Sequence, residues 1–177
     1  QDRSAVTYRD PERLRPKDSG LMAETVTPTD ADEQRDSIHR AIQLLTDGSC
    51  VGLPTEAGYV AAALALNDSA VERLATLPDA SLAVLARTVD EAYDLVPGLS
   101  RNGAKVATRC WPGPVFIRTG IDSATGGTLD ALGAATREHV TRNQLTCSAS
   151  AEPLIAELGR LIAAPLIISL PDRPNVT

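Results

Sequence analysis

The segment Pro54-Thr55-Glu56, with Tyr59 just after it, groups the polar side chains best suited to binding a small molecule. It follows the apolar run Cys50 to Leu53 and so lies where a predicted strand ends. Thr55 can offer a hydroxyl to a carboxylate or phosphate, and Glu56 can bind an amine or orient a water molecule. Each residue also has a structural interpretation: Thr55 as a turn cap, Glu56 as a solvated carboxylate and Tyr59 as a core aromatic.

Three further features bear on a binding site. Trp111-Pro112-Gly113-Pro114 can form a pocket wall or serve only as a structural turn. Ser169 lies near the end of an apolar run, and strand ends often face ligands in α/β sheets, although a hydroxyl satisfied inside the core fits equally well. The nearest candidate cations for an anionic ligand are Arg101, Arg109 and Arg118. Each of them can also be an ordinary surface arginine without a ligand.

Apolar residues recur with helical spacing in parts of the chain and form short continuous runs elsewhere. Gln34 to Asp47 is predicted to be a helix because its apolar residues fall at i, i+3, i+4 and i+7. Capping patterns predict helix starts at Asn67 or Asp68 and at Thr88. The run Tyr59 to Leu66 fits a helix or a strand. The other predicted strands are Leu82 to Ala86, Val115 to Arg118, Gln144 to Cys147 and Pro165 to Leu170. The other predicted helices are Arg101 to Arg109 and Glu152 to Ile162. We expect Gly120 to Gly133 to be a loop or insertion, and His139 to lie near a loop.

Alternating strands and helices predict an α/β fold. Residues 1–33 are polar and are expected to form an extended N-terminal arm ahead of a single domain over residues 34–177. The chain begins at Gln1, and we expect a processed product or part of a longer chain. Aromatic residues make up 3% of the chain, so the core is expected to consist mainly of Leu, Ile, Val and Ala.

Composition excludes several classes of function. The net charge of -6 argues against a generic basic surface, so a nucleic-acid partner would require a local basic patch. No apolar run approaches the roughly 20 residues of a membrane helix. The three cysteines are widely spaced and form neither a disulfide framework nor a metal motif. We therefore expect free thiols in a reducing cytoplasm, no metal site and no tightly bound cofactor.

Several segments occur together in the order and spacing of one family, across most of residues 27–173. They are Pro54-Thr55-Glu56 with Tyr59, Asn67 with Ala70, Val71 and Leu74, Leu82 to Leu85, Trp111 to Pro114, and Pro165 to Ser169. This set resembles the YrdC-like family, which includes the threonylcarbamoyl-adenylate synthases. The resemblance implies a single YrdC-like domain in which a twisted mixed sheet, flanked by helices, forms a concave nucleotide pocket.

The resemblance also implies a chemistry and a site. Family enzymes join threonine, bicarbonate and ATP into threonylcarbamoyl-adenylate, release pyrophosphate and so feed threonylcarbamoyladenosine modification of tRNA. An active member would be a nucleotidyltransferase that uses ATP with Mg. The implied substrate or nucleotide contacts are Thr55, Glu56, Tyr59 and Ser169, and the implied pocket-shaping residues are Pro54, Trp111, Pro112, Gly113 and Pro114.

The chain departs from the family pattern where the family handles phosphate. The Lys-x-Arg loop of the family should lie between Leu77 and Leu82. This chain has Pro78-Asp79-Ala80-Ser81 there, without Lys or Arg. Lys and Arg neutralise phosphate oxygens and steady the leaving pyrophosphate. The remaining departures are Ala57, Val60-Ala61 and Val115-Phe116, Leu170-Pro171-Asp172 at the Ser-Ala-Asn motif, and Leu145-Thr146-Cys147, without Arg, at the Val-Arg strand.

Three functions follow from these matches and departures. The chain is predicted to be a divergent member that binds a nucleotide (ATP or AMP) or RNA, including double-stranded RNA, with reduced or lost catalysis. The first alternative is an active synthase that forms threonylcarbamoyl-AMP. The second is a structural or protein-interaction domain of a longer chain or homo-oligomer, with the polar arm as its contact segment.

Overall fold

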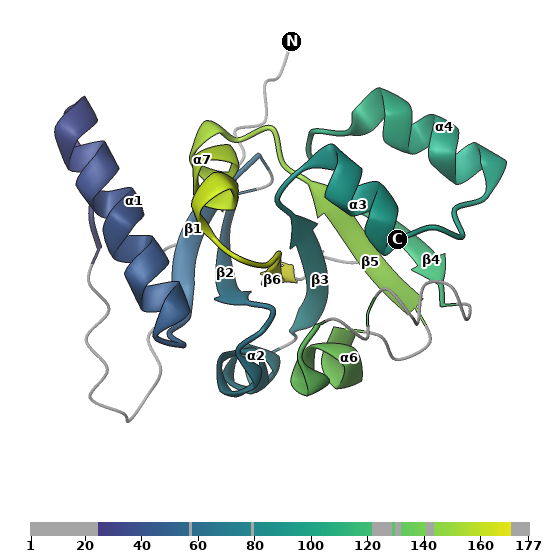
Figure 1. Ribbon diagram of the computed structural model, residues 1–177, viewed down its shortest axis with the longest axis horizontal. Coiled ribbons are helices and arrows are strands. Elements are labelled where there is room, and N and C mark those ends of the chain that lie inside the picture. Colours follow the sequence, from purple (N-terminus) through teal and green to yellow (C-terminus); the bar gives the residue numbers. More distant parts are fainter. Residues whose placement is uncertain are drawn as a thin grey trace, which may run out of the picture.

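The computed structural model describes residues 25–56, 58–78, 80–121, 129, 132–140 and 144–170. Within them, six strands form one sheet in the order β1-β2-β6-β3-β5-β4, flanked by helices (Figure 1). The strands are β1 (Val51–Thr55), β2 (Gly58–Leu64), β3 (Ser81–Ala86), β4 (Ile117–Gly120), β5 (Gln144–Ala149) and β6 (Leu166–Leu170). The helices are α1 (Ala31–Thr46), α2 (Asp68–Ala75), α3 (Val89–Leu95), α4 (Arg101–Cys110), α6 (Ala134–Val140) and α7 (Pro153–Leu161).

The sheet is mixed and strongly twisted, as the resemblance implied. β3 and β5 are parallel, whereas the other neighbouring strands are antiparallel. β2 and β3 are both antiparallel to β6, yet their arrows point in opposite directions in Figure 1, where β6 is seen nearly end-on. The strand direction therefore rotates steeply through β6. This rotation is larger than the usual twist between neighbouring strands.

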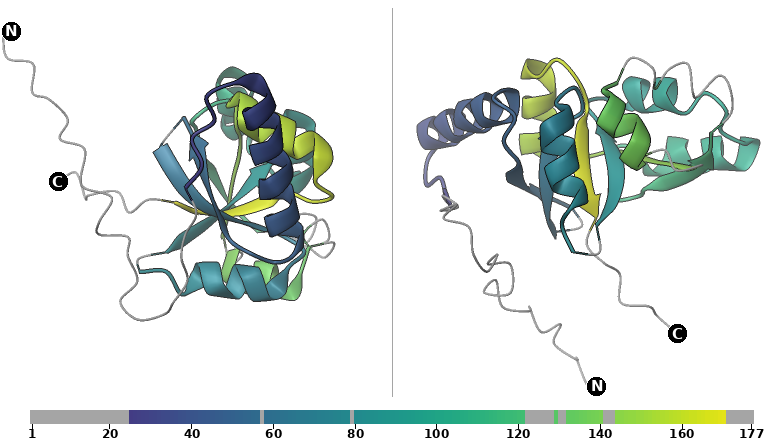
Figure 2. Two further views of the ribbon diagram at one scale, coloured as in Figure 1. Left: turned by 90° about the vertical axis from the view of Figure 1, so that its left-hand side faces the viewer. Right: turned by 90° about the horizontal axis from the view of Figure 1, so that it is seen from below.

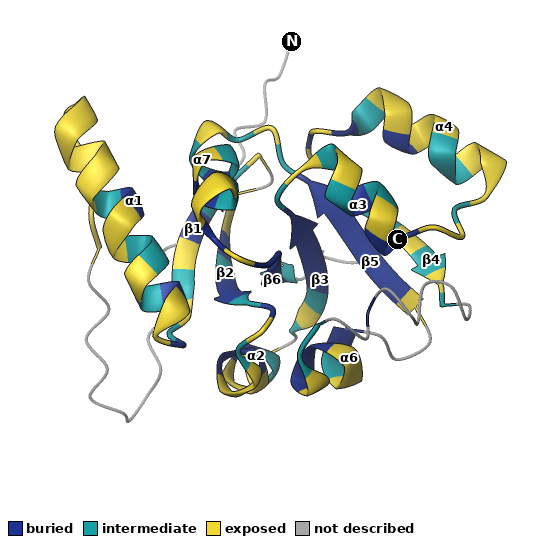
Figure 3. Ribbon diagram, viewed as in Figure 1, coloured by how far each residue is buried: buried dark blue, intermediate teal, exposed yellow. Residues whose placement is uncertain are grey.

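Two hydrophobic cores lie on opposite faces of the sheet. Alternate residues of β3 show the division: Val84 and Ala86 belong to the first core, and Ala83 and Leu85 belong to the second. Helices α2, α3 and α6 cover the first core, and α1 and α7 cover the second. Figure 2 shows α1 beside α7 on one side of the sheet and α2 beside α6 on the other, and Figure 3 shows β3 and β5 almost wholly buried between them.

The expected core composition is confirmed among the described residues. Trp111 is the one aromatic residue among the buried hydrophobic side chains, and the others are aliphatic apart from Cys147. Within the described part of the chain, no helix is both long and apolar enough to span a membrane.

Most of the predicted elements are confirmed. Ile38 and Leu45 of the predicted stripe are buried on α1, although this helix begins three residues earlier than predicted because the Asp30 carboxylate caps it by accepting from the Glu33 N–H at 2.8 Å. The N-cap of α2 is Asn67, and that of α3 is Thr88. The ambiguous run from Tyr59 forms a strand, β2.

Two features of the second half of the chain differ from the predictions. His139 lies in the last turn of helix α6, which was not predicted. β4 begins at Ile117 instead of Val115, because the carbonyl of Val115 accepts hydrogen bonds from side chains outside the strand. Residues 1–24 of the predicted arm, and residues 122–128, 130 and 131 of the predicted loop, lie outside the described residues.

Two leucines of α7 provide a matched test of the second core. Leu158 is fully buried, whereas Leu161 on the same helix is 53% exposed. Leu158→Ala is expected to lower the free energy of unfolding by about 2–5 kcal/mol through lost burial and a residual cavity. Leu161→Ala should change it by less than about 1 kcal/mol. Urea denaturation of both variants measures the difference, and equal effects would contradict the described orientation of α7.

Candidate functional site

The turn between β1 and β2 contains the residues that led the sequence-based predictions. The Thr55 hydroxyl donates to the carbonyl of Gly58 at 2.7 Å, and Gly58 has a φ of 112°, which favours glycine. The Glu56 carboxylate accepts from the Ser150 hydroxyl at 2.7 Å and from the backbone N–H of Ala151. Glu56 therefore connects this turn to the segment between β5 and α7.

The environment of Glu56 favours its ionised form. Partial burial by itself would raise the pKa of this carboxyl group, but hydrogen bonds from its own N–H, the Ser150 hydroxyl and the N–H groups of Ala151 and Glu152 outweigh that effect. The pKa of Glu56 is therefore held below its ordinary value. A carboxylate occupied in this way holds the turn in place and is poorly suited to act as a base.

The Trp-Pro-Gly-Pro element forms a turn that docks on the end of β5. The buried Trp111 indole donates to the Val115 carbonyl at 2.8 Å, and its peptide bond to Pro112 is cis. The Gly113 N–H donates to the Ala149 carbonyl at 2.8 Å. Ser148 is 1% exposed, and its hydroxyl donates to the Val115 carbonyl at 2.8 Å. The end of β5 is thus held by the 111–115 turn, and the residues just after it are held by Glu56.

Of the two other predicted contact residues, Tyr59 pairs with Pro54 in the β1–β2 hairpin, and Ser169 lies on β6. Tyr59 is 73% exposed, so its interpretation as a core aromatic is wrong. Ser169 pairs with Ala61 and Leu82, which pack against the first core. Thr55 lies on the second-core face because it is two residues from Leu53 on β1. The sheet therefore places Ser169 and Thr55 on opposite faces.

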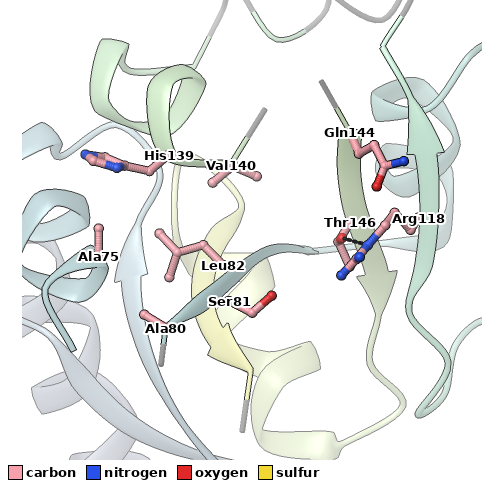
Figure 4. A pocket seen from close by; sticks show the side chains of 9 residues that line it. All are labelled: Ala75, Ala80, Ser81, Leu82, Arg118, His139, Val140, Gln144 and Thr146. Atoms are coloured by element: carbon pink, nitrogen blue, oxygen red, sulfur yellow. Dashed lines mark hydrogen bonds between the residues drawn. The ribbon is translucent and has the colours of Figure 1, made fainter. Parts of the chain in front are cut away.

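A cavity of about 310 Å³ lies at the start of β3 and β5, beside β4 and α6 (Figure 4). None of the predicted contact or pocket-shaping residues lines it. Of the three candidate arginines, Arg118 does, while Arg101 and Arg109 lie exposed on α4. The lining residues are Ala75, Ala80, Ser81, Leu82, Arg118, His139, Val140, Gln144 and Thr146.

The chemistry of this cavity favours an anion. Arg118 and Thr146 are direct partners across β4 and β5, and the Arg118 Nε donates to the Thr146 hydroxyl at 3.2 Å. Ser81 and Gln144 add a hydroxyl and an amide, whereas no carboxylate is among the lining residues described. The cavity also includes part of the stretch where the Lys-x-Arg loop was expected, although Asp79 lies outside the described residues.

The described residues offer little support for metal or thiol chemistry. Within this part of the chain, no three His, Cys, Asp or Glu side chains group closely enough to hold a metal ion. The three cysteines are free thiols. Burial raises the pKa of Cys147 to about 12, so this thiol is protonated at neutral pH, whereas the thiolate is the nucleophilic form.

A family model that unites Sua5, YciO and YrdC, described as "Telomere recombination", matches residues 43–169. The chain belongs to the Sua5/YciO/YrdC family. This assignment confirms the resemblance that the ordered motifs indicated. No curated protein matches the chain.

Solved structures share the fold of this family member. P. abyssi Sua5 complexed with L-threonine is 21% identical, with a TM-score of 0.59 over 74% of this chain and 37% of the Sua5 chain. E. coli YciO is 17% identical, with a TM-score of 0.58 over 77% of this chain and 63% of YciO. Full-length HypF in a phosphate- and nucleotide-bound form is 18% identical, with a TM-score of 0.55 over 75% of this chain and 20% of HypF. The match thus spans little more than a third of the Sua5 chain.

Gly113 tests how closely the Trp-Pro-Gly-Pro turn is packed. A Cβ atom at this position would lie 2.6 Å from the backbone oxygen of Cys110, whereas one at Gly120 would meet nothing within 4 Å. Gly113→Ala is expected to destabilise the protein by about 1–3 kcal/mol because backbone must move, and Gly120→Ala should cost much less. Thermal and urea unfolding compare the variants; an unaffected Gly113→Ala protein would rule out the described packing.

Glu56 gives a pH-dependent prediction. Because its folded pKa is lowered, its contribution to stability is present above the unfolded pKa of about 4.3 and is lost as the pH falls through the folded pKa. Glu56→Gln is therefore expected to be less stable than the unmodified protein at pH 7, with a difference that shrinks below about pH 4.

Denaturant titrations between pH 3 and pH 8 measure this difference. Glu72→Gln is the matched control, because Glu72 is exposed on α2 and makes no side-chain hydrogen bond within the described part of the chain. A pH-independent effect of Glu56→Gln would contradict an ionic role for the carboxylate.

Proposed function

We propose that this chain is a divergent family member that binds a nucleotide in the cavity at the start of β3 and β5, with reduced or lost adenylate-forming activity. The observation that carries the proposal is the cavity itself, which combines the Arg118 guanidinium with polar groups from Ser81, Gln144 and Thr146 and no described carboxylate. Arginine with hydroxyl and amide donors is a common way to bind phosphate.

Relatives support the choice of ligand. P. abyssi Sua5 was solved with L-threonine, and HypF in a phosphate- and nucleotide-bound form. A nucleotide also suits the mixed lining of this cavity, because the half-buried Leu82 provides an apolar side chain beside the polar groups. The sequence-based contacts Thr55, Glu56, Tyr59 and Ser169 remain predictions outside this cavity.

Reduced catalysis follows from the departures in the sequence. Family enzymes join threonine, bicarbonate and ATP, with Mg, into threonylcarbamoyl-adenylate and release pyrophosphate. No Lys or Arg occupies positions 78–81, where the resemblance places two cations. The loss of cations that stabilise a leaving pyrophosphate costs several kcal/mol, or about a thousandfold in rate. Mg would have to be bound mainly by the phosphates, because no carboxylate is described in the lining.

Calorimetry with ATP and AMP tests nucleotide binding, and labelled threonine with bicarbonate, ATP and Mg tests turnover. We expect measurable binding and a rate of adenylate formation about a thousandfold or more below that of an intact synthase measured in parallel. Ser81→Trp should fill the cavity and weaken binding, because Ser81 is exposed at its lining. Ser69→Trp is the control, since Ser69 is exposed on α2 outside the cavity.

The other predicted functions are distinguishable outcomes. Turnover at the rate of an intact synthase would identify an active enzyme. If the protein binds short double-stranded RNA but neither ATP nor AMP, an RNA-binding protein is favoured. If the protein binds none of these ligands and self-associates in light scattering, the structural or oligomeric alternative is favoured. The cytoplasmic location remains a prediction based on the cysteine pattern.

A further inference from the structure

Two arginines that line cavities in the described part of the chain, Arg87 and Arg118, are held in very different ways. Arg87 lines a second cavity of about 240 Å³, where its NH2 group lies 2.7 Å from a Glu91 carboxylate oxygen and its NH1 group donates to the Ile162 carbonyl. Its charge and its donors are therefore satisfied within the protein. Among the described residues, the Arg118 side chain makes one hydrogen bond, from Nε to Thr146, and contacts no carboxylate.

This arrangement leaves the outer end of the Arg118 guanidinium available. Both terminal nitrogens lack a protein partner within the described residues, and together they carry four N–H donors in a planar fork. Such a fork matches two oxygens of one phosphoryl or carboxylate group. The side chain is exposed in β4, so a ligand can reach it without a change in the fold.

Thr146 fixes the position of that fork. It is 8% exposed and stands directly opposite Arg118 in the β4–β5 pair. Its hydroxyl oxygen accepts from Nε, so the hydroxyl hydrogen remains available to an anion on the same side. Figure 4 shows Arg118 and Thr146 together with Gln144 nearby, and shows Leu82, Val140 and His139 gathered on the other side of the cavity.

We infer that Arg118 and Thr146 bind a single phosphoryl group and that the cavity binds nucleoside monophosphates at least as tightly as triphosphates. This inference rests on the proposed function and specifies its ligand. The guanidinium and the Thr146 hydroxyl bind the phosphate, and the nucleobase lies against the half-buried Leu82 and His139. One guanidinium neutralises about half or more of the charge on one phosphoryl group, which carries about −1.5 to −2 charges at pH 7.

A triphosphate gains less from this site. Its two additional phosphoryl groups add negative charge that requires further cations, or a Mg ion that carboxylates help to hold. Arg118 is the one Arg or Lys among the described lining residues, and that lining has no carboxylate. The extra phosphates would therefore remain in solvent and contribute little affinity.

Calorimetry at fixed ionic strength with adenosine, AMP, and ATP with and without Mg tests the inference. AMP is expected to bind at least about tenfold more tightly than adenosine and no less tightly than ATP. Arg118→Ala should weaken AMP binding by about 10- to 100-fold, the range for charge-assisted hydrogen bonds, and leave adenosine binding unchanged. Arg118→Lys should restore only part of the affinity, because a lysine lacks the fork.

Arg101→Ala is the matched control, because it removes the same charge from an exposed position on α4 away from the cavity. Thr146→Val should weaken AMP binding while keeping the charge of Arg118. If Arg118→Ala binds AMP as tightly as the unmodified protein, or if ATP binds more tightly than AMP, the inference is wrong while nucleotide binding stands. If adenosine, AMP and ATP all fail to bind, the proposed function itself is wrong.

Discussion

The buried hydroxyl of Ser148 sets the geometry on which the cavity depends. A buried hydroxyl needs a partner, and this one donates to the Val115 carbonyl, which the Trp111 indole also contacts. These two bonds keep Val115 in the turn, so β4 starts at Ile117 and pairs in the register that sets Arg118 against Thr146. A shift by one residue would turn the arginine to the opposite face. The turn thus sets the strand register that places the Arg118 cation at the cavity.

The family signature and the candidate ligand cavity are separate parts of the molecule. Pro54-Thr55-Glu56 forms a turn whose carboxylate is bonded to Ser150 and Ala151, close to the start of α7. Arg118 lines a cavity at the other end of β5, where Gln144 begins the strand. The steep turn of the sheet through β6 accounts for this separation, because it carries the β1–β2 turn round to the carboxyl end of β5. In this chain, therefore, the most recognisable motif and the cation of the cavity lie apart.

Local features of the sequence were sufficient to predict the elements that local interactions decide. Asn67 and Thr88 cap their helices through backbone contacts three residues away, and the apolar stripe of α1 is buried as its spacing indicated. Helix α6 was missed because Ala134 to Val140 contains mainly small or polar residues and no clear stripe. The side of the sheet that Ser169 faces depends on strand register, which no local pattern reveals. Arg118 was recognised as a candidate cation, but its partner Thr146 follows only from the pairing of β4 with β5.

The position of the cation also bears on why binding can persist when catalysis declines. A Lys-x-Arg loop can close on ATP and follow charge as it moves to the leaving pyrophosphate, whereas Arg118 is fixed on a strand and tied to Thr146. A fixed contact made equally in the bound state and the transition state strengthens binding without speeding the chemical step. Acceleration requires a group that stabilises the charge developing on the leaving group. A strand-borne arginine at one phosphoryl group meets the first requirement and not the second, which is the physical basis for proposing a nucleotide-binding protein rather than an efficient synthase.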